Sequence, residues 1–252
     1  MTGWWLLALV GVAGVAAGAI NTVVGSGTLI TFPILLALGV PPVTANVSNT
    51  IGLVPGSFSG AWSYRRELAG QRNRLIRLGS ASLLGGIAGA LLLLVLPAGV
   101  FKTVVPVLII LALTLVVAQP WLSRRLNGTE HHGSAIRPVL LWGAVLLTGV
   151  YGGYFGAAQG VLLIAILGTL LEADLQRMNA LKNVLTGLVN GVAGVIFIAL
   201  ATPNWTYVAI IAVGSALGGQ IGGLIGRRLS LAALRGIIVV VGVAALIKFL
   251  LS

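Results

Sequence analysis

The chain has 252 residues, of which 58% are hydrophobic, only 8% are charged and 36 are glycine. This composition excludes an ordinary soluble globular domain and predicts an all-α polytopic membrane protein. The net charge of +11 does not indicate nucleic-acid binding, because the basic residues fall in short clusters between hydrophobic segments rather than on one face or arm. The absence of cysteine excludes disulfides, thiolate metal sites and cysteine nucleophiles.

The first part of the chain, from Met1 to Tyr64, contains no charged residue. It is long enough for two or three crossings, since about 20 helical residues span the hydrocarbon layer. Its start, MTGWWLLALV, lacks the basic region of a cleaved signal peptide, so we expect it to form the first membrane helix. The run is interrupted by the polar, glycine-rich stretch NTVVGSGTLITFP, between Asn21 and Pro33. Such a break at membrane depth is tolerated only where it is buried in protein or lines a wet cavity.

This break is a candidate ligand site that includes Asn21 and Gly25. A short helix that begins at Ser26 or Gly27 would direct its free backbone N–H groups and its positive dipole end into the protein, which favours an anion. The hydroxyl groups of Ser26 and Thr28 add further donors. The alternative is that these small residues only let helices pack closely, as they commonly do in membranes. The segment by itself leaves both interpretations open.

Ten uncharged or nearly uncharged segments follow one another along the chain. Two of them, 27–39 and 160–171, are too short to cross a bilayer and each follows a glycine-bearing break, so each is expected to form a hairpin with the preceding segment. The segments are 4–24, 27–39, 42–63, 78–96, 99–122, 138–156, 160–171, 178–200, 205–226 and 231–251.

The basic residues predict how these segments are oriented. If each hairpin begins and ends on the same side, all of the 15 basic residues except Lys102 and Lys248 fall on one side of the membrane. The positive-inside rule makes that side cytoplasmic. We therefore expect 65–77 and 123–137 to be cytoplasmic, and 200–204 and both termini to face outward.

The few acidic and histidine residues all lie in or beside loops. No carboxylate is therefore placed at membrane depth to relay protons or to bind a cation. A pair of histidines without further ligands is a weak metal signal, so no metal site is expected. The residues are Glu67, Glu130, His131, His132, Glu172 and Asp174.

Two blocks of small residues recur between the halves of the chain. At an offset of 135 the matches are Gly18, Gly25, Ala45, Gly52 and Gly56 with Gly153, Gly160, Ala180, Gly187 and Gly191. At an offset of 133, LLGGIAGALL resembles ALGGQIGGLI. We predict two inverted-topology repeats, 1–126 and 137–252, joined by a cytoplasmic loop at 127–136. Each repeat is a broken helix hairpin plus three membrane helices, an organisation typical of secondary transporters.

A polar stripe follows Asp174 at helical spacing, and it comprises Asn179, Lys182, Asn183, Thr186 and Asn190. It should face the protein interior or a water-filled cavity, because such a stripe is costly in lipid. Segment 42–63 carries a shorter version with Asn46, Asn49, Thr50 and Ser57. The alternative is that these amides only join helices, at roughly 1 kcal/mol each.

Lys182 lies about 12 Å along a helix that begins near Asp174. We expect its flexible stem to bring the ammonium to water at the cytoplasmic mouth of an anion pathway. The alternative is a simple anchor at the cytoplasmic surface.

Two stretches of the sequence, GAINTVVGSGTLITFPILLALGVPPVTANVSNTIGLVPG and NALKNVLTGLVNGVAGVIF, resemble the TauE/SafE sulfite exporter family, also called the toluene sulfonate uptake permeases. The resemblance covers nearly the whole chain, including its two halves. It implies transport of small sulfur-containing anions, such as sulfite or organosulfonates, across a bacterial plasma membrane. The second break, GGYFGAAQG, departs from glycine-richer versions of the motif by carrying Gln159. Substrates vary within this family, so no single anion is implied.

These observations together predict a secondary transporter that works by alternating access, without cofactor or metal, with a small anion and the lipid bilayer as partners. An anion channel with the same donors is the alternative. A membrane-embedded enzyme is disfavoured because no carboxylate, cysteine or histidine lies at depth. Whether a proton or sodium ion is coupled to transport, and whether the protein is a homodimer, are left open. The predicted substrate-binding residues are Asn21, Gly25, Ser26, Gly27, Thr28, Asn46, Asn49, Gln159, Gly160, Asn179, Lys182 and Asn183.

Overall fold

The computed structural model describes residues 3–126, 137–171, 174–225 and 231–250, and its regular structure in these ranges is entirely helical. The all-α prediction is therefore confirmed. The predicted loop at 127–136 lies outside the described residues, as do Glu130, His131, His132 and Glu172. The helices are α1 (Trp4–Val23), α2 (Thr28–Ala37), α3 (Pro42–Ser63), α4 (Arg72–Val95), α5 (Ala98–Leu126), α6 (Arg137–Tyr154), α7 (Gln159–Leu170), α8 (Leu175–Leu200), α9 (Trp205–Ile225) and α10 (Leu231–Leu250).

Each of these helices coincides with one predicted segment. The largest differences are at α4, which begins six residues before the predicted start, and α5, which ends four residues after the predicted end. The prediction stopped at charged residues, whereas arginine is a good helix former and continues both helices beyond their apolar parts.

The lengths and hydropathies of the helices are those of a multi-pass membrane protein. Among the described residues, α1, α4, α8 and parts of α5 and α9 are long and apolar enough to cross a bilayer. The helices α2 and α7 have only 10 and 12 residues and are too short to cross it alone. Their shortness was predicted from the sequence.

The two short helices follow breaks with the same backbone construction. After α1, Gly25 has φ +88° and its N–H donates to the Ile20 carbonyl at 3.1 Å; after α6, Gly156 has φ +76° and its N–H donates to the Tyr151 carbonyl at 3.1 Å. Glycine adopts this left-handed backbone at little cost. The equivalent of Gly25 is therefore Gly156, at an offset of 131.

The predicted match of Gly25 with Gly160 at an offset of 135 was wrong. Gly160 lies in the first turn of α7, beyond the break. The error is four residues, about one helical turn, so the shifted glycines stay on the same helix face and their spacing alone could not reveal it.

The glycines that match at an offset of 133 make corresponding contacts. A methyl group added at Gly85 or Gly89 of α4 would overlap the Leu146 or Val150 carbonyl of α6. A methyl group added at Gly218 or Gly222 of α9 would overlap backbone atoms of α1 in the same way. Small residues thus let α4 lie directly on α6, and α9 directly on α1.

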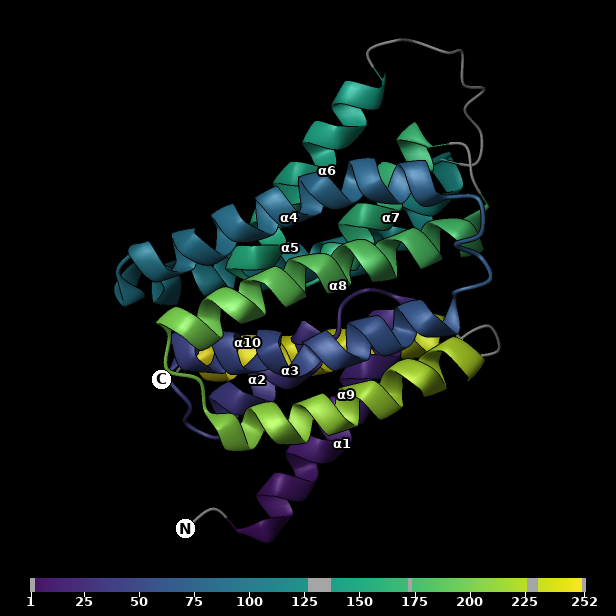
Figure 1. Cartoon of the computed structure of the whole chain (residues 1–252). Coiled ribbons are helices and arrows are strands. Elements are labelled where there is room, and N and C mark those ends of the chain that lie inside the picture. Colours follow the sequence, from purple (N-terminus) through teal and green to yellow (C-terminus); the bar gives the residue numbers. More distant parts are fainter. Residues whose placement is uncertain (1–2, 127–136, 172–173, 226–230, 251–252) are drawn as a thin grey trace.

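The helices form two bundles that each contain both halves of the sequence (Figure 1). In the first bundle, α9 packs against α1 and α3, and α10 packs against α2. In the second bundle, α4 packs against α6 and α8, and α5 packs against α7. We call them the α1 bundle (α1, α2, α3, α9, α10) and the α6 bundle (α4 to α8). They meet mainly along α3 and α8, which cross the middle of Figure 1, and the contact of α5 with α10 adds a smaller area.

Candidate functional site

The two breaks lie against each other where the bundles meet. The Gly160 N–H donates to the Gly25 carbonyl at 3.0 Å. A methyl group on either glycine would overlap the backbone of the other. Two segments that are far apart in the sequence therefore form one site.

The beginning of α2 presents unpaired donors inside the protein. Within the described part of the chain, the backbone N–H groups of Ser26, Gly27 and Thr28 donate no hydrogen bond. The Ser26 side chain is 1% exposed, and its hydroxyl has no partner among the described residues. Buried polar groups are nearly always paired. Free donors at the positive end of a helix therefore favour an anionic ligand here.

Gly27 also has a packing role, so ligand binding and close helix packing, the two interpretations of this break, do not exclude each other. A methyl group at Gly27 would lie 2.5 Å from the Ala17 carbonyl oxygen and 2.9 Å from Cβ of Asn21. The absence of a side chain lets the start of α2 lie directly on α1. Gly27 can offer its N–H to a ligand while its α-carbon faces α1.

Asn49 holds α2 against α3. Its Nδ2 donates to Thr28 Oγ1 at 3.2 Å, and its Oδ1 accepts from the hydroxyl of Thr31. Both the oxygen and the nitrogen of the Asn49 amide therefore make hydrogen bonds that join α2 and α3. Thr28 accepts the bond from Asn49, so its own hydroxyl hydrogen remains available.

A second buried group joins α1, α3 and α8. The Nδ2 atoms of Asn21 and Asn190 each donate to Ser57 Oγ at 3.3 Å. The Ser57 hydroxyl in turn donates to the Leu53 carbonyl at 3.1 Å. This set links the two bundles because Asn190 belongs to α8, whereas Asn21 and Ser57 belong to α1 and α3.

Lys182 is fully buried, with an exposed fraction of 0%. Its Nζ donates to the carbonyls of Asn21 at 3.0 Å and Thr22 at 2.8 Å, and Asn183 Nδ2 donates to the Thr22 carbonyl at 3.3 Å. The prediction that the ammonium reaches water was therefore wrong. The last carbonyls of a helix lack partners within it, and α1 ends at Val23 close enough for α8 to supply them.

Among the remaining predicted residues, some polar groups lack a hydrogen-bond partner and others have one. Gln159 is 1% exposed, its amide lies over Gly152, and both its polar atoms lack a partner among the described residues. Gly160 does not offer a free N–H, because Gly25 already accepts it. The Nδ2 of Asn46 donates to the Tyr154 carbonyl at 2.9 Å, and Asn179 is buried near the start of α8. The second break thus contributes a side-chain amide, and the backbone N–H groups of Ala157 and Ala158 also donate no hydrogen bond among the described residues.

Thr22 and Thr31 are part of this arrangement although the sequence did not single them out. Thr22 follows Asn21, and Thr31 lies three residues after Thr28, one helical turn away. A search for hydroxyl groups one turn from the candidate donors would have found Thr31. No local signal marks the carbonyl of Thr22 as an acceptor for a lysine 160 positions later.

The site contains a buried lysine and, among the described residues, no cluster of metal ligands. The described residues contain no group of three or more His, Cys, Asp or Glu side chains that could hold a metal. Lys182 is the one lysine, arginine, aspartate or glutamate side chain among the described residues that is fully buried.

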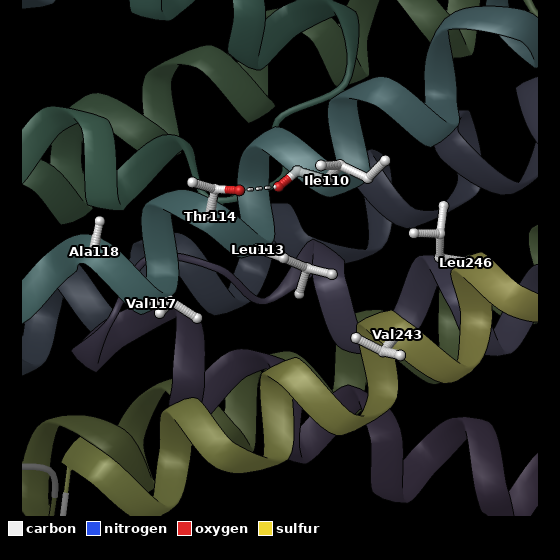
Figure 2. Close-up of a pocket in the computed structure, with 7 residues that line it drawn as sticks. All are labelled: Ile110, Leu113, Thr114, Val117, Ala118, Val243 and Leu246. Carbon is white, nitrogen blue, oxygen red and sulfur yellow. Dashed lines mark hydrogen bonds between the residues drawn. The ribbon is translucent and has the colours of Figure 1, made fainter.

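A separate hollow of about 460 Å³ lies between α5 and α10. Figure 2 shows that Val117 and Leu113 face Val243 across it. Its one hydroxyl, on Thr114, donates to the Ile110 carbonyl at 2.8 Å. An apolar hollow without free donors does not suit an anion, so the breaks remain the candidate site.

Comparison with known proteins identifies the family of this chain. The family described as sulfite exporter TauE/SafE matches residues 10–249. The chain is 27% identical over 245 residues to "Probable membrane transporter protein ORF9" of Sinorhizobium sp. The aligned residues cover 97% of this chain and 92% of that protein. It is 26% identical over 235 residues to "Probable membrane transporter protein YfcA" of Escherichia coli K12, which covers 93% of this chain and 86% of that protein. Because the family match spans nearly the whole sequence, the chain is a membrane transporter that belongs to the TauE/SafE sulfite exporter family.

Proposed function

We propose that the protein is a secondary transporter that moves small sulfur-containing anions across the bacterial inner membrane by alternating access. The observation that carries this proposal is the set of unpaired donors at the start of α2. The Ser26 hydroxyl and the N–H groups of Ser26, Gly27 and Thr28 are neighbouring donors without a partner among the described residues, and all three residues are buried. Sulfite and sulfonate groups present several oxygen acceptors and no obligatory donor, so they match such a set.

The position of Lys182 supports an anion rather than a neutral ligand. A methyl group at Gly160 would lie 3.0 Å from Cδ of Lys182, and Gly160 also contacts Gly25, the residue before Ser26. The lysine stem therefore passes beside the breaks. The side chains of Gln159 and Thr28 supply further donors from α7 and α2. Neutral donors and one cation can hold an anion without a fixed carboxylate to repel it.

The contacts between the bundles support alternating access. Lys182 and Asn183 bond to α1, Asn190 bonds to Ser57, and Asn46 bonds to the Tyr154 carbonyl. These hydrogen bonds can be replaced by bonds to water or substrate as the bundles rock, so the site can open to either side in turn. We infer that the moving bodies are the α1 bundle and the α6 bundle, with the connections 64–71 and 201–204 between them.

The two ends of the molecule agree with the inverted-repeat topology that we propose. Arg177 Nη2 donates to the Ala69 carbonyl at 3.0 Å, so the start of α8 lies beside the basic connection after α3. At the opposite end of α3, the Asn204 N–H donates to Ser48 Oγ at 2.8 Å. The positive-inside rule assigns the first end to the cytoplasm and the second to the outside, where we also place both termini.

A binding screen on purified protein tests this function. Sulfite, sulfoacetate, sulfate and thiosulfate are titrated against the wild type, against Ser26→Ala and against Thr103→Ala. The control Thr103 is an exposed residue of α5 whose hydroxyl bonds to the Gly99 carbonyl. We expect Ser26→Ala to weaken binding about fivefold, which corresponds to about 1 kcal/mol for one ordinary hydrogen bond.

Thr103→Ala should bind like the wild type. Equal affinities for wild type and Ser26→Ala would remove the start of α2 from the site. Failure of all four anions to bind the wild type would contradict the assignment to sulfur-containing anions.

A further inference from the structure

Lys182 is buried without an acidic partner. Its Nζ has two acceptors within the described part of the chain, the carbonyls of Asn21 and Thr22, and both are neutral. The buried polar residues described in the structure include no aspartate or glutamate. The cationic form of Lys182 therefore has no fixed counter-charge at this position.

The helices packed around α8 do not supply a counter-charge either. The sequences of α1, α3 and α7 contain no titratable side chain. In α4 the titratable residues, at positions 72, 74 and 77, are all arginines near its start. In α6, the Tyr151 hydroxyl is occupied by the Ala157 carbonyl, and the Tyr154 ring packs on Phe101; Arg137 is its first residue. Along α8 itself, the other charged side chain is Arg177.

Two relaxations are open to a buried ammonium in such surroundings. It can lose its proton or it can gain an anion, and without either the desolvation cost is several kcal/mol. In the present conformation, the two hydrogen bonds of Lys182 Nζ fit an amine that has lost its proton. A neutral amine has two N–H donors, which match the two carbonyl acceptors, whereas an ammonium has a third donor that is free to meet an anion.

We propose that Lys182 carries a proton through the transport cycle, so that each anion moves together with one proton in the same direction. This inference rests on the proposed function. On the loading side, a proton from water binds the Nζ lone pair and the resulting ammonium offsets one negative charge of the anion. On the release side, the anion and the proton both leave, and the neutral amine again bonds only to Asn21 and Thr22. No proton is consumed over the whole cycle.

Proteoliposomes with a pH-sensitive dye in their lumen test this coupling. The driving force is an inward gradient of sulfate, thiosulfate or sulfoacetate, whichever the binding screen selects, and valinomycin with potassium clamps the voltage. The charges of these anions do not change across the neutral pH range, so a pH signal reports a proton that the protein moves. We expect the wild-type lumen to acidify as the anion enters, by one proton per anion.

Two variants identify the proton carrier. Lys182→Gln keeps hydrogen-bond donors but cannot titrate, so it should move no protons and should bind the anion with an affinity that does not depend on pH. In the wild type, affinity should fall by up to about tenfold per pH unit as the pH rises through the titration of the lysine, because only the protonated form offsets the anion. Lys102→Gln removes an exposed lysine of α5 and should behave like the wild type.

The outcomes separate this inference from the proposed function. Anion entry without acidification, or pH-independent binding by the wild type, would overturn proton coupling and leave anion transport intact. Acidification that persists in Lys182→Gln would assign the proton to another group and overturn the role of Lys182. If Lys182→Gln does not fold, pH-independent binding by the wild type would still overturn proton coupling. No uptake of any tested anion by the wild type would instead overturn the proposed function.

Discussion

The contact between the two breaks predicts that Gly25→Ala is strongly destabilising. The substitution has two separate costs. A left-handed backbone, here φ +88°, costs an alanine roughly 1–2 kcal/mol. The added methyl group would also overlap the backbone of Gly160, and overpacking of this kind costs typically 1–3 kcal/mol. We therefore expect a total loss of about 2–5 kcal/mol in the free energy of unfolding.

Two matched variants divide this loss into its parts. Gly39 also has a positive φ, +80°, but a methyl group there would meet nothing within 4 Å. Gly39→Ala should therefore show the backbone cost alone, roughly 1–2 kcal/mol. Gly160→Ala has the steric overlap without a left-handed backbone and should show the packing cost, reduced by the up to about 1 kcal/mol that alanine gains over glycine within a helix.

Unfolding of the purified variants in one detergent, followed by tryptophan fluorescence, gives the comparison. The expected order places Gly25→Ala as the least stable of the three. If Gly25→Ala were no less stable than Gly39→Ala, the breaks would not be in contact, and the single site built from them would be refuted.

Three further predictions concern helix packing, capping and topology. Gly89→Ala and Gly222→Ala should both destabilise the protein in the same unfolding assay, because their methyl groups would meet the Val150 and Ala19 carbonyls. Gly143→Ala should instead stabilise α6 by up to about 1 kcal/mol, because a methyl group there would meet nothing within 4 Å. Asp174→Ala should lower stability by about 1 kcal/mol and Asp174→Asn by less, since the Asp174 carboxylate accepts from the N–H groups of Gln176 and Arg177 at 2.9 and 3.0 Å; equal effects would contradict the cap. Single cysteines at Gly70 and Pro203 should react with a membrane-impermeant thiol reagent from opposite sides, and labelling from the same side would contradict the topology.

The helices themselves could be predicted because their signal is local. Apolar runs bounded by glycine, proline or charge fix where a membrane helix begins and ends, and the short runs after Gly25 and Gly156 fix the two short helices. The stripe from Asn179 to Asn190 is buried as its spacing predicted. Each of these features depends on residues within one or two helical turns.

The partners of the site residues could not be predicted because they come from distant parts of the chain. Burial of Lys182 depends on two carbonyls at the end of α1, and Gly160 loses its free N–H to Gly25. The interleaving of the two sequence halves depends on how α4 and α9 pack. Glycine spacing shows that a close approach occurs, but it does not say which helix approaches.

Counterflow in proteoliposomes tests most directly that this protein is a carrier for small sulfur-containing anions. Vesicles loaded with the unlabelled anion that binds best are diluted into a trace of the same anion labelled with radioactive sulfur. Exchange by a carrier should concentrate the label transiently above its equilibrium level inside the vesicles, and Ser26→Ala should require more unlabelled anion for the same effect. Label that only rises to equilibrium, without an overshoot, would indicate a channel, and no entry of label would contradict the account of the site.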